Sequence, residues 1–156
     1  MKKINKPVWM ALLAVCVMVF LLAACAAKPP AENAEGPAKP SNAGGPGAAV
    51  NLTGDATKGA DVFTASCVTC HGAEGKGGVA NPGSKDGSVP ALNPIDDTMV
   101  SKDAKTFATN IDLFIEHGSK PEGDSPTLVM LPLGDNKTLQ PQEIADVIAY
   151  VISLNK

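Results

Sequence analysis

The chain has no arginine, so all 13 of its basic residues are lysines, and only 4% of its residues are aromatic. Proteins that bind nucleic acids usually gather Lys and Arg on one face and stack aromatic rings on the bases. Here 16 acidic residues outnumber the lysines and give a formal net charge of −3. The sequence therefore predicts no nucleic-acid partner, and it favours partners that are basic or apolar where they touch the chain.

Strand patterns are also missing. No alternation of apolar and polar residues runs for more than a few positions, and Gly and Pro interrupt residues 71–94 repeatedly. A second loop rich in turn-forming residues occupies positions 118–138. Because strand signals are absent, the sequence predicts no β-sheet. The expected fold class is an all-α domain with long loops.

Helical signals are present in three segments, residues 55–66, 103–118 and 141–156. Asp55 suits the N-cap of the first, Gly118 follows the end of the second, and a proline opens the third. In the second and third segments the apolar residues repeat at helical spacing, at Phe107, Ile111, Phe114 and Ile115 and at Ile144, Val147, Ile148, Val151 and Ile152. Three to four helices are therefore predicted.

The N-terminal segment has the layout of a secretory signal. Residues 8–27 are apolar throughout and follow three lysines with no acidic neighbour. The letters LAAC at residues 22–25 resemble the lipobox of bacterial lipoproteins, which predicts a signal peptide over residues 1–24 and lipidation of Cys25. An uncleaved membrane-spanning helix is the alternative, since about 20 apolar residues also cross a bilayer. Both interpretations anchor the protein to a membrane, outside the cytoplasm.

The segment after the anchor, residues 25–54, is rich in Ala, Pro and Gly and is predicted to be a disordered linker. A flexible chain of this length spans roughly 25 to 30 Å. The folded domain is predicted over residues 55–156. Removing residues 1–24 removes three lysines and no acidic residue, so the formal net charge of the mature chain is −6.

Residues 67–71 read CVTCH and bring two thiols and an imidazole within one short stretch. A thioredoxin-like dithiol follows a strand, and no strand pattern precedes Cys67. A structural zinc site needs four ligands, and the candidates in the mature chain are Cys25, Cys67, Cys70, His71 and His117. Because Cys25 is predicted to be lipidated, four ligands remain only if His71, which directly follows Cys70, is counted as one of them. A disulfide across two intervening residues would be strained. These three alternatives explain the stretch less fully than covalent haem attachment.

Haem attachment gives each of the three side chains a role. The thiols of Cys67 and Cys70 each add to one vinyl group of the porphyrin, and His71 becomes the proximal iron ligand. A large apolar group would also complete the core of a domain that has few and short helices. The sequence therefore predicts one covalently bound haem c.

The predicted domain resembles the small monohaem class I cytochromes c over nearly its whole length. The resemblance rests on CVTCHG, on PALNP downstream, on the methionine in LVMLPLGD and on the closing LQPQEIADVIAYVISL. It implies the class I cytochrome c fold wrapped around one haem, in which the carbonyl of Pro90 accepts a hydrogen bond from the ring N–H of His71. It also implies that Gly59 and Phe63 cross the last helix near Tyr150.

Three residues compete to be the second axial ligand of the iron: Met99, Met130 and His117. His117 ends a predicted helix, where histidine usually interacts with the helix dipole, and Met99 precedes that helix, where a thioether commonly fills a core gap. Met130 lies in an extended, proline-flanked loop, and in the family this loop closes over the haem face opposite the proximal histidine. Leu131 stands where the family commonly has proline. Met130 is the predicted ligand.

The resemblance implies electron transfer rather than enzymatic catalysis, with both axial ligands kept on the iron. Ligation by His and Met favours the reduced state. The expected setting is that of a membrane-tethered extracytoplasmic carrier, or a subunit of a respiratory or photosynthetic chain. Its expected partners are redox proteins of the cell envelope, with no small-molecule substrate. An open sixth site would make the domain a gas sensor or a peroxidase instead.

Overall fold

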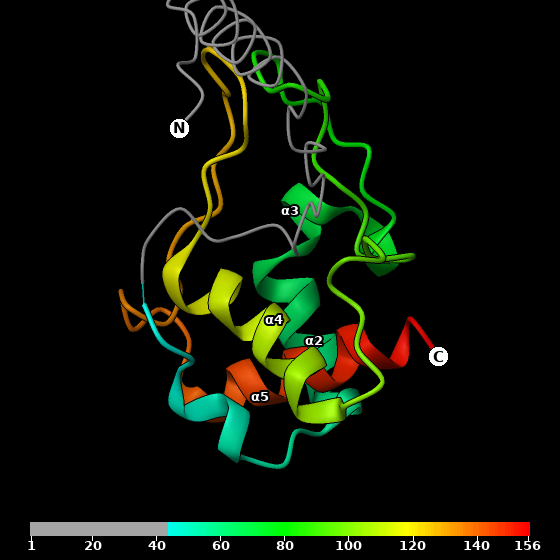
Figure 1. The fold of residues 1–156 in the computed structure, drawn as a ribbon, viewed down its shortest axis with the longest axis vertical. Helices are drawn as coiled ribbons and strands as arrows, with labels where there is room; N and C mark the ends of the chain where they lie inside the picture. The colour runs from blue at the N-terminus through cyan, green and yellow to red at the C-terminus, as the bar shows by residue number, and fades with distance from the viewer. Residues whose placement is uncertain (1–43) are drawn as a thin grey trace, which may run out of the picture. The chain divides into compact units, whose positions relative to one another are not determined.

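The computed structural model describes residues 44–156, so the predicted signal peptide, Cys25 and most of the predicted linker lie outside the described residues. The described part is helical and contains no β-strand, only two isolated antiparallel bridges, Ala80 with Ser88 and Ser119 with Met130. The predicted all-α fold is confirmed (Figure 1). Its elements are η2 (Ala48–Asn51), α2 (Ala56–Ser66), α3 (Val68–His71), η3 (Ala73–Gly75), α4 (Ala104–His117) and α5 (Pro141–Ser153).

The three predicted helices form, and the last of them ends three residues earlier than predicted. The Asp55 carboxylate caps α2 by accepting hydrogen bonds from the N–H groups of Thr57 and Lys58, at 2.9 and 3.3 Å. Gly118 follows α4 with φ of 71°, which is a left-handed conformation that favours glycine. α5 begins at Pro141 and ends at Ser153, three residues before the end of the chain.

The core forms where α5 packs against α2 and α4. At the crossing of α2 and α5, a Cβ on Gly59 would lie 2.0 Å from the carbonyl oxygen of Asp146, so only glycine allows this approach. One turn later, the rings of Phe63 and Tyr150 meet with centroids 5.3 Å apart. The crossing expected for Gly59, Phe63 and Tyr150 is therefore confirmed. The most deeply buried core residues are Ala49, Phe63, Ile144, Val147, Ile148 and Val151.

Residues 44–54, which the sequence places in the linker, pack on the helices. Ala49 in η2 is only 2% exposed, and the N–H of Gly47 donates to the Asp112 carboxylate at 2.7 Å. A Cβ on Gly54 would lie 2.0 Å from the carbonyl oxygen of Ala145 in α5. The same small residues that are typical of a linker allow this segment to lie close to the helices. The packed part of the chain therefore begins before the predicted boundary at residue 55.

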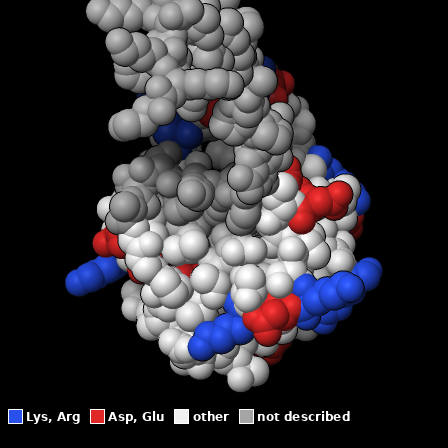
Figure 2. Space-filling model, viewed as in Figure 1, with Lys and Arg blue, Asp and Glu red and all other residues white. Residues whose placement is uncertain are grey.

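Two long loops, residues 76–103 and 118–140, extend from the helices toward the same end of the described part (Figure 1). Within residues 44–156, no helix has both the length and the apolar character needed to cross a membrane. On the face drawn in Figure 2, lysines lie beside acidic residues, so neither charge forms a continuous patch on the described surface in view.

Candidate haem site

The two cysteines and the histidine lie on one turn of the chain, where α2 gives way to α3. Cys67 breaks the helix with φ of −119° and ψ of −32°. Its carbonyl oxygen accepts hydrogen bonds from the N–H groups of His71, at 2.9 Å, and of Cys70, at 3.2 Å. Side chains three and four residues apart in a helical turn share a face. The turn therefore presents both thiols and the imidazole to one side, and all three side chains are partly buried.

The thiol of Cys67 does not have the lowered pKa of a reactive dithiol. Both are free, and burial, with a smaller contribution from Cys70, raises the pKa of Cys67 to about 11. Redox-active cysteines instead have lowered pKa values, because the thiolate is the nucleophile. Among the described residues, no three His, Cys, Asp or Glu side chains are grouped so that they could hold a metal ion. Within this part of the chain, neither a dithiol centre nor a zinc site is supported.

The His71 ring has a buried nitrogen that suits a metal-bound histidine. Its Nδ1 atom is buried and makes no hydrogen bond within ordinary limits. Burial lowers the pKa of His71, whereas the backbone carbonyl of Pro90 acts on the ring in the opposite direction and raises it. The lowered pKa favours the neutral ring, the form that ligates a metal, and the Pro90 carbonyl lies near enough to influence it. The carbonyl is not close enough in this structure to count as a hydrogen-bond partner.

Glycines bring the Pro90 segment close to His71. The N–H of Gly77 donates to the carbonyl oxygen of His71 at 2.7 Å. Gly77 has φ of 68°, and a Cβ on it would lie 2.6 Å from the backbone nitrogen of Ala91. A side chain at position 77 would push away the chain that carries Pro90, so this glycine is needed for the surroundings of the histidine.

Met130 lies in an extended segment beside the end of α4. Its backbone pairs with Ser119, through N–H to O distances of 2.8 and 2.9 Å. Met130 is partly buried and packs against the core, whereas its neighbours Val129 and Leu131 are 47% and 59% exposed. Side chains alternate in an extended chain. The sulfur-bearing side chain is therefore the one of the three that is directed toward the body of the domain.

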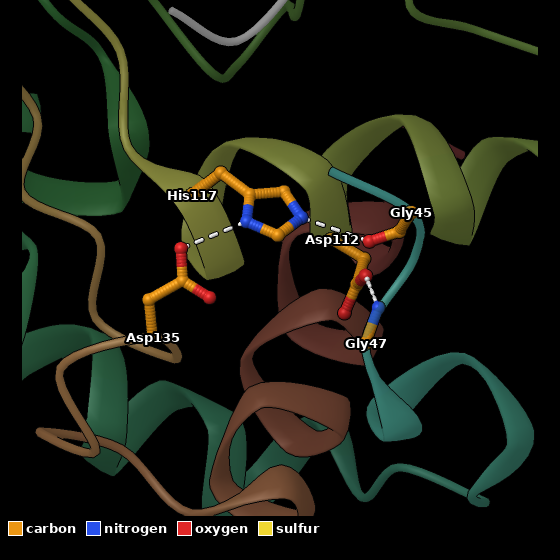
Figure 3. A network of polar contacts seen from close by, with 5 residues as sticks. All are labelled: Gly45, Gly47, Asp112, His117 and Asp135. Atoms are coloured by element: carbon orange, nitrogen blue, oxygen red, sulfur yellow. Dashed lines mark hydrogen bonds and ion pairs between the residues drawn. The ribbon is translucent and has the colours of Figure 1, made fainter. Parts of the chain in front are cut away.

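The other two candidate ligands have different surroundings. Met99 is 7% exposed and belongs to the hydrophobic core. The Nδ1 atom of His117 lies 2.9 Å from the Asp135 carboxylate, and its Nε2 atom lies 2.8 Å from the carbonyl oxygen of Gly45 (Figure 3). The bond to Asp135, followed by that to Gly45, raises the pKa of His117. Both ring nitrogens of His117 therefore have partners that are not a metal.

Asn81, like Asp112 and Asp146, is a buried polar residue that the sequence did not predict. Asn81 is 1% exposed, and its side chain bonds the backbone of Leu128, two residues before Met130. In the sequence it is one more polar residue in a loop rich in Gly and Pro, and the Asn-Pro pair at 81–82 indicates only a turn. No local pattern marks its burial.

These features define a small helical protein that carries haem on a CxxCH turn. The model of the family described as Cytochrome c matches residues 56–155, and the chain belongs to that family. No curated protein and no solved structure matches the chain significantly. The fold is that of a small cytochrome c, the cofactor is covalent haem c with its iron, and the function is haem-based electron transfer, since members of this family are generally electron carriers. The residues fit this group: the thiols are free, they share a face with the imidazole, and Nδ1 of the imidazole is unsatisfied.

Proposed function

We propose that this cytochrome c carries electrons with His71 and Met130 as the two axial ligands of its iron. The observation that carries the proposal is the turn from Cys67 to His71, in which Nδ1 of the histidine is buried near the carbonyl of Pro90. The haem supplies a one-electron couple when bound. The protein residues attach it, orient it and limit access of water and other ligands to the iron.

Each side chain has a separate role in this proposal. Cys67 and Cys70 would hold the haem covalently, each through one thioether bond to what was a vinyl group of the porphyrin. The carbonyl of Pro90 would orient His71 by accepting from its Nδ1–H when haem is bound, which would fix the tautomer that ligates through Nε2. The thioether sulfur of Met130 completes the ligand set and favours the reduced iron, because it is a softer and weaker donor than a second nitrogen.

The choice of Met130 is tested by replacing each candidate separately. We expect Met130→Ala to abolish the weak long-wavelength sulfur-to-iron absorption of the oxidised protein and to lower the midpoint potential. Met99→Ala is the matched control: it should keep the band and lose stability only, because Met99 is a core residue. If the band survives in Met130→Ala, the ligand assignment is wrong. Rapid binding of carbon monoxide to the reduced wild-type protein would favour an open sixth site instead.

We also propose that the domain works outside the cytoplasm and is tethered to a membrane. Support comes from the basic and apolar residues 1–24, from LAAC ending at Cys25 and from the linker between Cys25 and Gly44. Redox proteins of a respiratory or photosynthetic chain are the proposed partners, and the mature charge of −6 favours basic contact surfaces on them. Affinity capture of the full chain from solubilised membranes separates two arrangements. Stoichiometric partners indicate a subunit, and their absence indicates a shuttle.

A further inference from the structure

A hairpin formed by residues 78–89 is joined at its base to the proximal histidine. The hairpin is closed by hydrogen bonds from Gly78 N–H to the carbonyl of Val89, at 3.0 Å, and from Val89 N–H to the carbonyl of Val79, at 2.8 Å. The residue before it, Gly77, bonds the carbonyl of His71, and the residue after it, Pro90, faces the His71 ring. Both ends of the hairpin are therefore adjacent to His71.

The far end of the hairpin is joined to the segment that leads to Met130. The Nδ2 atom of Asn81 donates to the carbonyl oxygen of Leu128 at 3.0 Å, and the N–H of Leu128 donates to Oδ1 of Asn81 at 2.7 Å. One amide side chain thus satisfies both backbone groups of Leu128, as a neighbouring strand would. Beside it, the N–H of Thr127 donates to the carbonyl of Pro82 at 3.0 Å.

A second connection between the same two loops lies at the surface. The N–H of Lys85 donates to the carbonyl of Glu122 at 2.7 Å, and the two side chains form an ion pair at 3.0 Å. These side chains are 65% and 79% exposed, whereas Asn81 is 1% exposed. Exposed ion pairs contribute little, and buried polar groups lose much more when a partner is removed. Asn81 is therefore the stronger connection.

We propose that Asn81 is a positioning residue, which holds the Met130 segment against the hairpin that adjoins His71. The inference rests on the proposed ligation by His71 and Met130. Leu128 precedes Met130 by two residues, and Met130 itself pairs with Ser119 of the same loop. On the C-terminal side the segment is bonded to α4, where the N–H of Leu133 donates to the carbonyl of Ile115 at 2.9 Å, so Asn81 secures its N-terminal side. The two ligand-bearing parts of the chain are thus linked through the hairpin, independently of the iron, and Asn81 slows the departure of the Met130 sulfur.

Two variants of the full holoprotein test this role. Asn81→Ala removes both bonds to Leu128. Asn81→Asp keeps the volume of the side chain but, when ionised, cannot donate to the Leu128 carbonyl. Two controls leave the bonds between the Asn81 side chain and Leu128 in place: Ser84→Ala removes the hydroxyl that donates to the backbone carbonyl of Asn81, and Glu122→Gln removes the exposed ion pair. Circular dichroism and covalently retained haem verify that each variant has folded.

Two measurements report on the variants. Hydrogen exchange at the Leu128 amide reports directly on the contact, without any redox reaction. The rate at which imidazole binds to the oxidised iron reports on how often Met130 leaves it. We expect Asn81→Ala, which loses two buried hydrogen bonds, to raise both rates by about tenfold or more. Asn81→Asp loses only the bond to the Leu128 carbonyl and keeps the acceptor for the Leu128 N–H, so it should raise both rates by a smaller factor. The controls should change each rate by less than about twofold, within the range of exposed contacts.

A double variant tests whether Asn81 acts through Met130. In a Met130→Ala background, the further change Asn81→Ala should no longer alter the rate of imidazole binding. If Met130→Ala abolishes the sulfur-to-iron band but the Asn81 variants bind imidazole at the wild-type rate, the positioning role is refuted and the ligation stands. Faster exchange at Leu128 with unchanged imidazole binding also refutes it, because Asn81 would then be structural only. If the sulfur-to-iron band survives in Met130→Ala, the proposed ligation by Met130 is wrong. The proposal that Asn81 positions a ligand is then wrong as well.

Discussion

Replacement of Gly59 by alanine should destabilise the domain, although the same change usually stabilises a helix. Gly59 lies inside α2, where alanine is favoured over glycine by about 1 kcal/mol. It is also the point at which α2 crosses α5. A Cβ there would lie 2.0 Å from the carbonyl oxygen of Asp146, 2.5 Å from its carbonyl carbon and 2.9 Å from Cβ of Tyr150.

The size of the effect follows from these distances. Ordinary contact begins at 3.4 Å, so the oxygen of Asp146 must move away by about 1.4 Å, the difference between 3.4 and 2.0 Å. The obstructing atoms are backbone, which no side-chain rotation can move. Overpacking of this kind costs about 1 to 3 kcal/mol or more. It exceeds the gain in helix propensity, and it is a large share of the roughly 5 to 15 kcal/mol that keeps a domain folded.

The assay is denaturant unfolding of the holoprotein, followed by helical circular dichroism. We expect Gly59→Ala to lower the unfolding free energy by about 2 kcal/mol, which is an overpacking cost near the upper end of about 1 to 3 kcal/mol less the gain of about 1 kcal/mol in helix propensity. Gly45→Ala is the control, because nothing lies within 4 Å of a Cβ built there, and it should be nearly neutral. Equal or greater stability of Gly59→Ala would show that α2 and α5 do not cross as closely as described.

Two further predictions concern the ends of the segment that joins the anchor to the domain. The pKa of His117 is raised above its ordinary value of 6.5 by Asp135 and then by Gly45, so its stabilising effect is full below about pH 6 and is lost as the pH rises through the raised pKa. The neighbouring carboxyls of Asp112 and Glu116 have pKa values raised by burial, so their ionisation also lowers stability as the pH rises. The unfolding free energy should therefore fall as the pH rises through the raised pKa of His117, and that of His117→Gln should fall less; an equal fall in both proteins would refute the role of His117. At the other end, Cys25→Ser should prevent lipidation and leave the haem spectrum unchanged. An intact wild-type mass that still includes Met1 would rule out lipidation and favour the membrane-spanning alternative.

The helices were predictable because their signals are local. Asp55 caps α2 through its own side chain, and the apolar repeat of α5 coincides with the face that is buried. The CxxCH turn was predictable for the same reason, since its three functional residues lie within one helical turn. A pattern that depends on residues close in sequence needs no knowledge of the tertiary structure.

The remaining features depend on contacts between residues distant in sequence. The segment that contains Ala49 has the composition of a linker, yet α4 and α5 provide a surface against which such small residues fit. His117 ends α4 as expected, but its contacts with Gly45 and Asp135 come from residues 72 and 18 positions away. Asn81 bonds a residue 47 positions away. Composition and periodicity contain no information about such pairs.

The two parts of this cytochrome c are stabilised by different interactions. The helical core depends on apolar burial and on the close crossing at Gly59, whereas the segments around the ligands are held by hydrogen bonds, those of His71 with Gly77, of Asn81 with Leu128 and of Ser119 with Met130. Local opening of such loops requires less free energy than global unfolding. Gly59→Ala should therefore weaken the whole domain while leaving imidazole binding nearly unchanged in the absence of denaturant. Asn81→Ala should do the reverse, because it loosens the Met130 side of the site and leaves the crossing of α2 and α5 intact.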